Sequence, residues 1–288
     1  MSAPVSKQEP QERRAVTIAV TSGKGGVGKT SVVVNLAVAL ARLRNRVTIL
    51  DADFGLGNVD VLLGLAPGGH VGHLLAGEKT LRDIVVAGPV GVQIIPASSG
   101  LQDLTSLTPR QWQRLADSLE TVCRESDYLL IDTAAGISDN VVALLVSAQR
   151  VLVVTSLEPS AIVDAYAVIK IVTNTDPRKE IAVLVNGARD QDEAELVFKQ
   201  LEVAAMRFLQ RHLVYYGFIV QDPAVREAVL MQRAVVDHRP QSPASRCYRV
   251  LASRVAGLTP GGGPGLKLVP PGSPAAGKPN AVEVQPCA

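Results

Sequence analysis

Short runs of β-branched and aliphatic residues alternate along the chain with longer segments whose apolar positions recur every three or four residues. The short runs are continuously apolar, which is typical of parallel strands buried on both faces. The longer segments have the spacing of helices with one buried side. This alternation predicts an α/β fold, with a doubly wound, mainly parallel sheet of seven or eight strands and helices on both faces.

The apolar runs place strands at 15–21, 46–51, 91–96, 127–132, 150–155, 180–186 and 213–220. The longer segments place helices at 29–44, 109–125, 138–147, 159–175, 191–211, 223–233 and 244–257. Glycines interrupt residues 60–86, for which we predict short helical pieces.

The composition changes near both ends of the chain. Residues 1–14 are polar and lack the apolar run of a signal peptide, so we predict a flexible lead-in. Residues 15–258 are predicted to form one domain. Residues 259–288 are rich in Pro, Gly and Ala, which predicts a disordered tail. The most apolar stretch, 141–154, contains Gln149 and Arg150, so no membrane span is expected.

Overall composition narrows the function only slightly. Of the 288 residues, 47% are hydrophobic and few are aromatic, which suits a large core of aliphatic side chains. The net charge of +2 gives no electrostatic argument for binding nucleic acid. The three cysteines are far apart and lack metal-ligand spacing, so we expect reduced thiols in a cytoplasmic protein.

A glycine-rich loop lies between the first predicted strand and helix. The pattern G-x-x-x-x-G-K-[ST] is matched from Gly23 to Thr30 without a mismatch. Such glycines let backbone N–H groups turn around phosphate oxygens at a helix N-terminus. Lys29 would reach the β- and γ-phosphates of a nucleotide, and the Thr30 hydroxyl would bind Mg²⁺. The predicted nucleotide-binding loop comprises Gly23, Lys24, Gly25, Gly26, Val27, Gly28, Lys29, Thr30 and Ser31.

The same glycines also fit G-x-G-x-x-G, the pattern of dinucleotide-binding proteins. Asp51 lies near the spacing expected for the acid that binds the ribose, so an NAD-dependent oxidoreductase is an alternative. However, the pair Lys29 and Thr30 has no role in dinucleotide binding, and a second acid, Asp53, follows. We therefore favour the phosphate loop.

Acidic residues follow two of the predicted strands, where ligands of parallel sheets bind. Asp132 ends the run YLLI and would hold Mg²⁺ through water. Asp53 would orient or deprotonate the attacking water, and Asp51 would support the water shell of the metal. The predicted metal site is thus Thr30, Asp51, Asp53 and Asp132. The alternative for each aspartate is a helix cap or a turn residue.

Lys24 directly follows the first loop glycine, a position where the general pattern requires no lysine. The string KGGVGKT from Lys24 to Thr30 resembles the deviant phosphate loop of the MinD/ParA class of dimerising ATPases. The resemblance implies that Lys24 reaches across a dimer interface to the nucleotide of the partner, as an arginine finger does. Lys24 and Asp53 would then be the catalytic residues. Hydrolysis would be slow and gated by dimerisation, and ATP would favour the homodimer.

Four further stretches are similar to the flagellar-number regulators called FlhG or FleN. They are LDADFGLGNVDVLLGL (50–65), IDTAAGISD (131–139), EPSAIVDAYAVIK (158–170) and VREAVLMQRAV (225–235). The resemblance implies control of flagellar number and placement, by restraining a flagellar transcription activator and by coupling to a GTPase of the signal-recognition type. A MinD-type division regulator, a ParA-type partition ATPase and a nucleotide-binding adaptor with negligible hydrolysis are alternatives. A partition ATPase would need a basic DNA-binding face, which the net charge does not indicate.

The resemblance also assigns residues to the nucleotide base and to the dimer interface. It implies that the side-chain amide of Asn186 recognises adenine, and that Val220 and Asp222 line the base pocket with Arg226 nearby. On pattern alone, Asn186 could equally be a turn residue at a strand end. By the same resemblance, Glu158 and Asp164 would face the dimer interface.

Two segments bear on membranes and partners. The predicted helix 244–257 carries three arginines but is expected to pack on the sheet, and the tail has only two lysines. We therefore expect weak or absent membrane association, no direct binding of nucleic acid, and a cytoplasmic protein that could be recruited to the cell pole or the inner membrane surface. Pro10 and the missing apolar stripe argue against a GTPase-activating helix in the lead-in.

Overall fold

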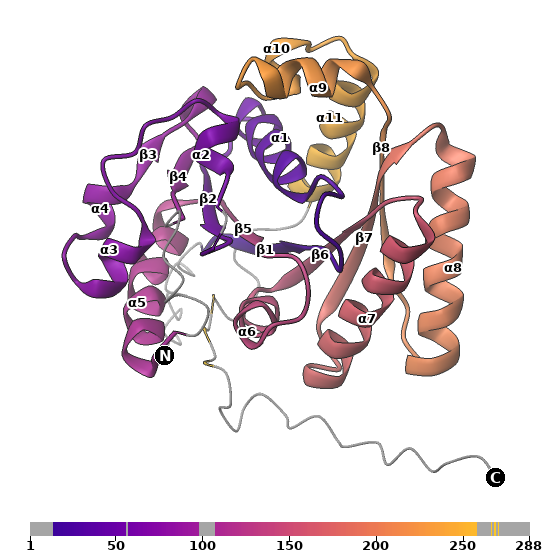
Figure 1. Cartoon of the computed structure of the whole chain (residues 1–288), viewed down its shortest axis with the longest axis horizontal. Coiled ribbons are helices and arrows are strands. Elements are labelled where there is room, and N and C mark those ends of the chain that lie inside the picture. Colours follow the sequence, from indigo (N-terminus) through magenta and orange to yellow (C-terminus); the bar gives the residue numbers. More distant parts are fainter. Residues whose placement is uncertain are drawn as a thin grey trace, which may run out of the picture.

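The computed structural model describes residues 14–55, 57–97, 107–257, 266, 268 and 270. Within these ranges, strands and helices alternate along the chain and form three layers, with a sheet between two layers of helices (Figure 1). The predicted fold class is therefore confirmed. Except for Arg14, Leu266, Leu268 and Pro270, the predicted lead-in and tail lie outside the described residues.

The sheet has eight strands in the order β3-β4-β2-β5-β1-β6-β7-β8. All neighbours are parallel except β3, which pairs with β4 in the antiparallel sense at the edge. Because β1 lies between β5 and β6, the loop that follows β1 is at the middle of the carboxyl edge. The strands are β1 (Val16–Thr21), β2 (Val47–Ala52), β3 (Val86–Ala87), β4 (Gln93–Ile95), β5 (Tyr128–Thr133), β6 (Arg150–Thr155), β7 (Glu180–Ala188) and β8 (Val214–Val220).

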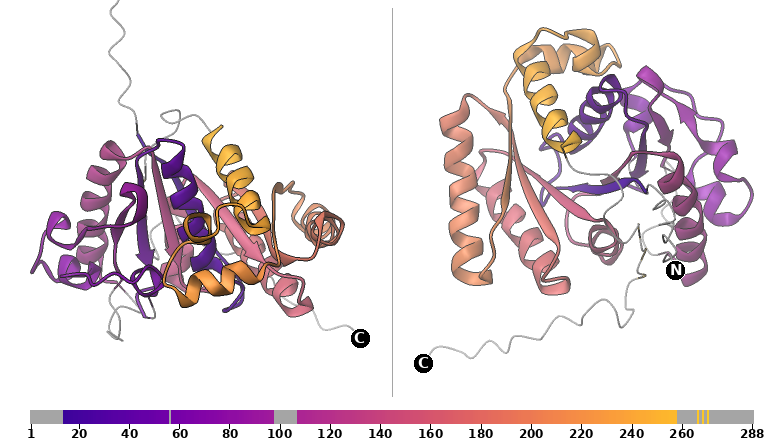
Figure 2. Two further views of the ribbon diagram at one scale, coloured as in Figure 1. Left: turned by 90° about the horizontal axis from the view of Figure 1, so that it is seen from above. Right: turned by 180° about the vertical axis from the view of Figure 1, so that it is seen from behind.

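Helices cover both faces of the sheet (Figure 2). The buried side chains of α1, α10 and α11 pack on one face, and those of α5, α6 and α7 pack on the other. The helices are α1 (Lys29–Arg42), α2 (Val59–Leu62), α3 (Val71–Ala76), α4 (Leu81–Ile84), the 3₁₀ helix η1 (Pro89–Gly91), α5 (Pro109–Glu125), α6 (Asp139–Ser147), α7 (Pro159–Thr175), α8 (Gln191–Leu209), α9 (Pro223–Leu230), α10 (Val235–His238) and α11 (Pro243–Ala256).

The central strands are buried along their whole length, which explains their continuously apolar sequences. Every residue of β1, β2 and β5 is buried. Successive side chains point to opposite faces, so Ile18 joins the cluster under α1 and α11 while Ala19 joins the cluster under α5 and α6. The predicted packing of the last helix is also confirmed, because α11 buries Tyr248, Leu251 and Val255 in the first of these clusters.

Three helices end two or three residues before the predicted positions. α1 ends at Arg42, α8 at Leu209 and α9 at Leu230. Within two residues of these ends, Arg44, Gln210 and Gln232 take positive φ angles of 66°, 50° and 52°. Glycine is the usual residue in that conformation, and its absence at these positions removed the signal that marks the end of a helix.

Three elements were not predicted, namely the two-residue strand β3, the three-residue 3₁₀ helix η1 and the four-residue helix α10. Segments this short hold less than two periods of any hydrophobic pattern. None of the described helices combines the length and the apolar character that crossing a membrane requires.

Candidate functional site

The glycine-rich loop connects β1 to α1, as predicted. Ser22 begins the loop, and its hydroxyl donates a hydrogen bond to the carbonyl oxygen of Lys24 at 2.9 Å. Gly26 and Gly28 have φ angles of 81° and 91°, a conformation that side chains disfavour. A Cβ atom at Gly28 would also overlap the side-chain amide of Asn186. The geometry of the loop therefore depends on both glycines.

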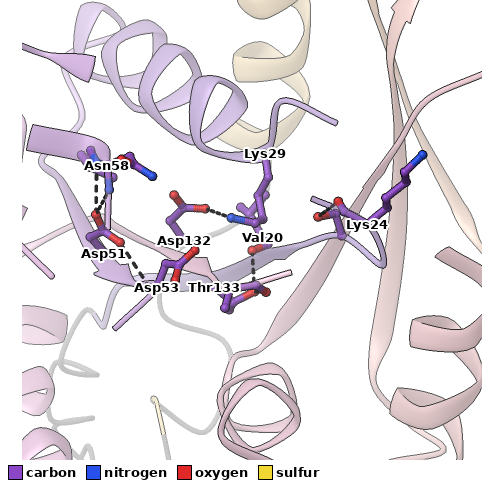
Figure 3. A network of polar contacts seen from close by, with 11 residues as sticks. Val20, Lys24, Lys29, Asp51, Asp53, Asn58, Asp132 and Thr133 are labelled. Atoms are coloured by element: carbon purple, nitrogen blue, oxygen red, sulfur yellow. Dashed lines mark hydrogen bonds and ion pairs between the residues drawn. The ribbon is translucent and has the colours of Figure 1, made fainter. Parts of the chain in front are cut away.

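Lys29 and Asp132 form a buried ion pair at the base of the loop (Figure 3). Lys29 Nζ lies 2.9 Å from Asp132 Oδ1, and the two side chains are 9% and 1% exposed. The Thr30 hydroxyl bonds to the same carboxylate. Burial raises the pKa of Asp132 above its usual value, although Lys29 and Thr30 act in the opposite direction. The first two helical residues of α1 thus converge on the end of β5.

Asp51 lies beside Asp132, because the two residues are register partners on β2 and β5. It accepts backbone hydrogen bonds from Asp53, Asn58 and Val59 at 3.2, 3.0 and 3.1 Å. Burial, and then the charge of Asp132, raise the pKa of Asp51 to about 7. The alternative of a turn-forming aspartate is therefore partly correct, since Asp51 closes the turn that leads into α2.

The chemistry of this donor set fits Mg²⁺, which prefers carboxylate and hydroxyl oxygens. Asp51, Asp132 and the nearby Asp53 place more negative charge here than Lys29 alone can balance. Within the described ranges, no three His, Cys, Asp or Glu side chains are arranged to hold a metal by themselves. A magnesium ion would therefore complete its coordination with phosphate oxygens and water, as is usual for this ion.

Lys24 points away from this pair (Figure 3). Its ammonium group contacts the start of α7. Its Nζ lies 2.5 Å from Glu158 Oε2 and 3.1 Å from the Ser160 hydroxyl. The Lys24 and Glu158 side chains are 41% and 65% exposed. Helix α7 packs directly on the loop here, because a Cβ atom at Gly23 would overlap the backbone of Asp164. Lys24 therefore contributes nothing to the buried pair of its own chain.

Ser160 was not singled out in the sequence. Its only signal there was its place two residues after Glu158, and the contact with Lys24 joins positions 136 residues apart. A contact across that separation leaves no trace in local pattern.

The residues predicted to surround the base lie near the carboxyl ends of β7 and β8 and at the start of α9. Asn186 Nδ2 donates a hydrogen bond of 2.7 Å to the carbonyl oxygen of Val27, which ties β7 to the loop. Val220 ends β8 and is partly buried. Arg226 is exposed on α9. Asp222 caps α9 by accepting the N–H of Ala224 at 2.9 Å, and it also accepts the N–H of Ala244 at 3.0 Å.

Comparison with known proteins gives consistent results. A family model described as ParA, NUBPL iron-transfer P-loop NTPase, matches residues 14–256. The antiactivator FleN of Pseudomonas aeruginosa is 46% identical over 238 residues, which are 83% of this chain and 85% of that protein. The flagellum site-determining protein YlxH of Helicobacter pylori is 34% identical over 223 residues, which are 77% of this chain and 73% of that protein.

Solved structures agree with this result. The cell division ATPase MinD of Pyrococcus furiosus has a TM-score of 0.72 at 25% identity, with 84% of this chain and 99% of MinD covered. The septum site-determining protein MinD of Pyrococcus horikoshii, in complex with Mg-ADP, has a TM-score of 0.71 at 25% identity, with 84% and 96% covered. These similarities favour the phosphate loop over the dinucleotide pattern.

The hydrogen bonds of Asp222 predict a structural role that can be measured. Asp222→Ala should lower the free energy of unfolding by about 1–2 kcal/mol, the usual value of a helix N-cap, in urea titrations at pH 7. Asp222→Asn keeps an acceptor oxygen and should lose less. Asp192→Ala, at an exposed acid of α8, is the control.

The difference in the free energy of unfolding between wild type and Asp222→Ala should also depend on pH. Burial acts to raise the pKa of Asp222, but the N–H groups of Ala244 and Ala224, the Ser242 hydroxyl and the charge of Arg246 together hold the pKa below the usual value. The stabilisation is then present above the unfolded pKa of about 4 and is lost as pH falls through the lower folded value. Equal unfolding of wild type and Asp222→Ala at pH 7 would contradict the capping role.

Proposed function

Since the chain belongs to the ParA family of P-loop NTPases, we propose that it is a Mg²⁺-dependent ATPase that cycles between a monomer and an ATP-bound dimer and regulates flagellar number and placement. The observation that supports the flagellar role is the similarity to the antiactivator FleN along most of both chains. The observation that supports the chemistry is the convergence of Lys29 and Thr30 on Asp132.

Binding of a triphosphate begins with an exchange of partners at Lys29. The ammonium group is now neutralised by Asp132 in a buried pair. Phosphate oxygens held by the loop N–H groups would take over that role, with the N-terminus of α1 adding its partial positive charge. Asp132 is thereby freed from Lys29 and becomes a carboxylate without a cation.

The freed carboxylate is then suited to a metal. Thr30 and Asp132 would hold Mg²⁺, and Asp51 and Asp53 would hold its water shell. When bound, Mg²⁺ neutralises charge on the β- and γ-phosphate oxygens. Asp51 is kept in place for this by three backbone N–H groups. Asp53 lies beyond the end of β2, where it would orient the water that attacks the γ-phosphate in line with the leaving oxygen.

Lys24 would act on the other subunit of a dimer. Its pair with Glu158 is largely exposed, and such pairs contribute at most about 1 kcal/mol. A triphosphate of higher charge on a facing subunit could therefore displace Glu158. Transition-state charge would be stabilised only when two subunits meet, so hydrolysis would be slow in the monomer. By linkage, ATP binding would favour the dimer to the same extent.

The partners are proposed on two grounds. An antiactivator acts by restraining an activator, so we propose a flagellar transcription activator as one partner. A GTPase of the signal-recognition type is proposed as another, because the resemblance of the sequence to the flagellar-number regulators implies it. We place the protein in the cytoplasm with weak or absent membrane binding. Asn186, Val220, Asp222 and Arg226 are proposed to surround the adenine.

The role of Lys24 can be tested by replacing it. Lys24→Ala should bind ATP within about twofold of wild type but lose ATP-dependent dimerisation, with turnover reduced about a hundredfold or more. Calorimetry, size-exclusion chromatography and phosphate release measure the three quantities. Lys199→Ala, at an exposed lysine of α8, is the control. Unchanged dimerisation and turnover in Lys24→Ala would remove this lysine from the mechanism.

The role of Asp53 predicts the opposite effect on the dimer. Asp53→Ala should lower turnover by about a hundredfold or more while ATP binding remains, because the group that orients water is lost but Lys29, Thr30 and Asp132 are kept. The ATP dimer should then persist during size-exclusion chromatography. Asp117→Ala, at an exposed acid of α5, is the control. Wild-type hydrolysis by Asp53→Ala would mean that another group positions the water.

The flagellar role requires a test in cells. The chain, expressed in Pseudomonas aeruginosa that lacks FleN, should restore the flagellar number of the parent strain, as counted by electron microscopy. Lys29→Ala should be expressed but fail to restore it. If the wild-type chain hydrolyses ATP when purified yet restores nothing, the ATPase proposal stands and the flagellar role is rejected.

A further inference from the structure

Two leucines beyond the last helix pack on the opposite side of the molecule from that helix. Leu266 and Leu268 are partly buried against the cluster formed by α5, α6 and α7. Helix α11, which precedes them, packs with α1 on the other face of the sheet. In Figure 1 these residues are the short yellow pieces away from α11. Leu266 and Leu268 thus lie on the other side of the sheet from α11, which ends at Ala256.

A hydrogen bond locates the contact on α5. The backbone of Leu266 bonds to the thiol of Cys123, a residue near the end of α5 that is 2% exposed. Burial raises the pKa of this thiol to about 11, and the bond from Leu266 acts in the opposite direction. The carbonyl oxygen of Cys123 in turn accepts the N–H of Ala15 at 2.7 Å, directly before β1. Leu266 thus lies where α5 ends and β1 begins.

The chain is long enough to make this contact within one molecule. Gly257 and Leu266 are nine positions apart, and an extended chain spans about 3.3 Å or more per position, or about 30 Å in total. Helix layers pack about 10 Å from a sheet, so crossing from one layer to the other requires about 20 Å. Four glycines and two prolines among residues 258–265 leave few bulky side chains to obstruct this path.

We propose that Leu266, Leu268 and Pro270 form an intramolecular strap that joins the α11 layer to the α5 layer. All three residues are partly buried. The occupant of this apolar surface is the chain's own tail. The strap supports the start of β1, and the glycine-rich loop follows the other end of this strand. The strap also shields the Cys123 thiol from solvent.

The reactivity of Cys123 reports whether the strap is docked. The chain has three cysteines, so Cys247→Ser with Cys287→Ser leaves Cys123 as the single thiol. In this background, Leu266→Asp with Leu268→Asp should undock the strap, and termination after Gly257 should remove it. Labelling of the native protein by a thiol reagent should become about tenfold faster or more in both, because even partial burial of two leucines shifts an opening equilibrium by about that factor.

The control variant introduces the same two charges on either side of the strap, as Thr259→Asp with Ser273→Asp, and should label at the wild-type rate. Hydrogen exchange provides a second measurement that does not depend on the thiol. Protection should fall at the end of α5 and at the start of β1 in the strap variants, while α8 keeps the wild-type protection.

Equal labelling rates in the strap variants and the control would overturn the proposal, as would unchanged exchange at α5 and β1. Dilution tests whether the strap is intramolecular. A wild-type labelling rate that is constant from high to low protein concentration supports a contact within one chain. A rate that rises on dilution would overturn it, because the tail would then come from a second copy.

Discussion

The ion pair between Lys29 and Asp132 is the interaction on which the site depends. Two opposite charges are removed from water at the centre of the carboxyl edge, which is costly unless each stabilises the other. The pair joins the first residue of α1 to the end of β5, and it thus links this helix to a central strand of the sheet. A buried ammonium group needs an anion beside it to remain charged at little cost, and Asp132 supplies one here. Under the proposed function, phosphate oxygens would replace that carboxylate when a nucleotide binds.

The second lysine of the loop is in a different environment. Lys24 lies five positions before Lys29, yet it is exposed and contacts Glu158 and Ser160 on α7. Water and salt weaken such an exposed pair, so its partner can change at little energetic cost. The loop therefore presents one cation that is firmly held inside the subunit and one that is loosely held at its surface. This division suits the proposed site, in which Lys29 binds the nucleotide of its own subunit and Lys24 acts only when a second subunit is in contact.

The fold could be predicted from the sequence because burial on both faces leaves a strong local signal. The strand 150–155 and the helices 109–125 and 159–175 were predicted with the boundaries that the structure has. Predictions were wrong at helix ends where Arg44, Gln210 or Gln232 replaces the usual glycine. The aspartates of β2 and β5 could be placed side by side because parallel strands end at one edge. The contact of Lys24 with Ser160 and the two hydrogen bonds of Asp222 join distant segments, and no local pattern encodes them.

The register of β2 against β5 has a consequence for folding. Asp51 and Asp132 are direct partners, and the residues before them on both strands alternate between the two hydrophobic clusters. A slip of one residue would turn each acid toward a different layer and would reverse every core side chain on the strand. The same alignment of the two strands thus packs the hydrophobic core and brings the two acids together. A misaligned chain would lose both at once, so under the proposed function the number of nucleotide-binding sites per chain in a preparation reports the fraction that has folded correctly.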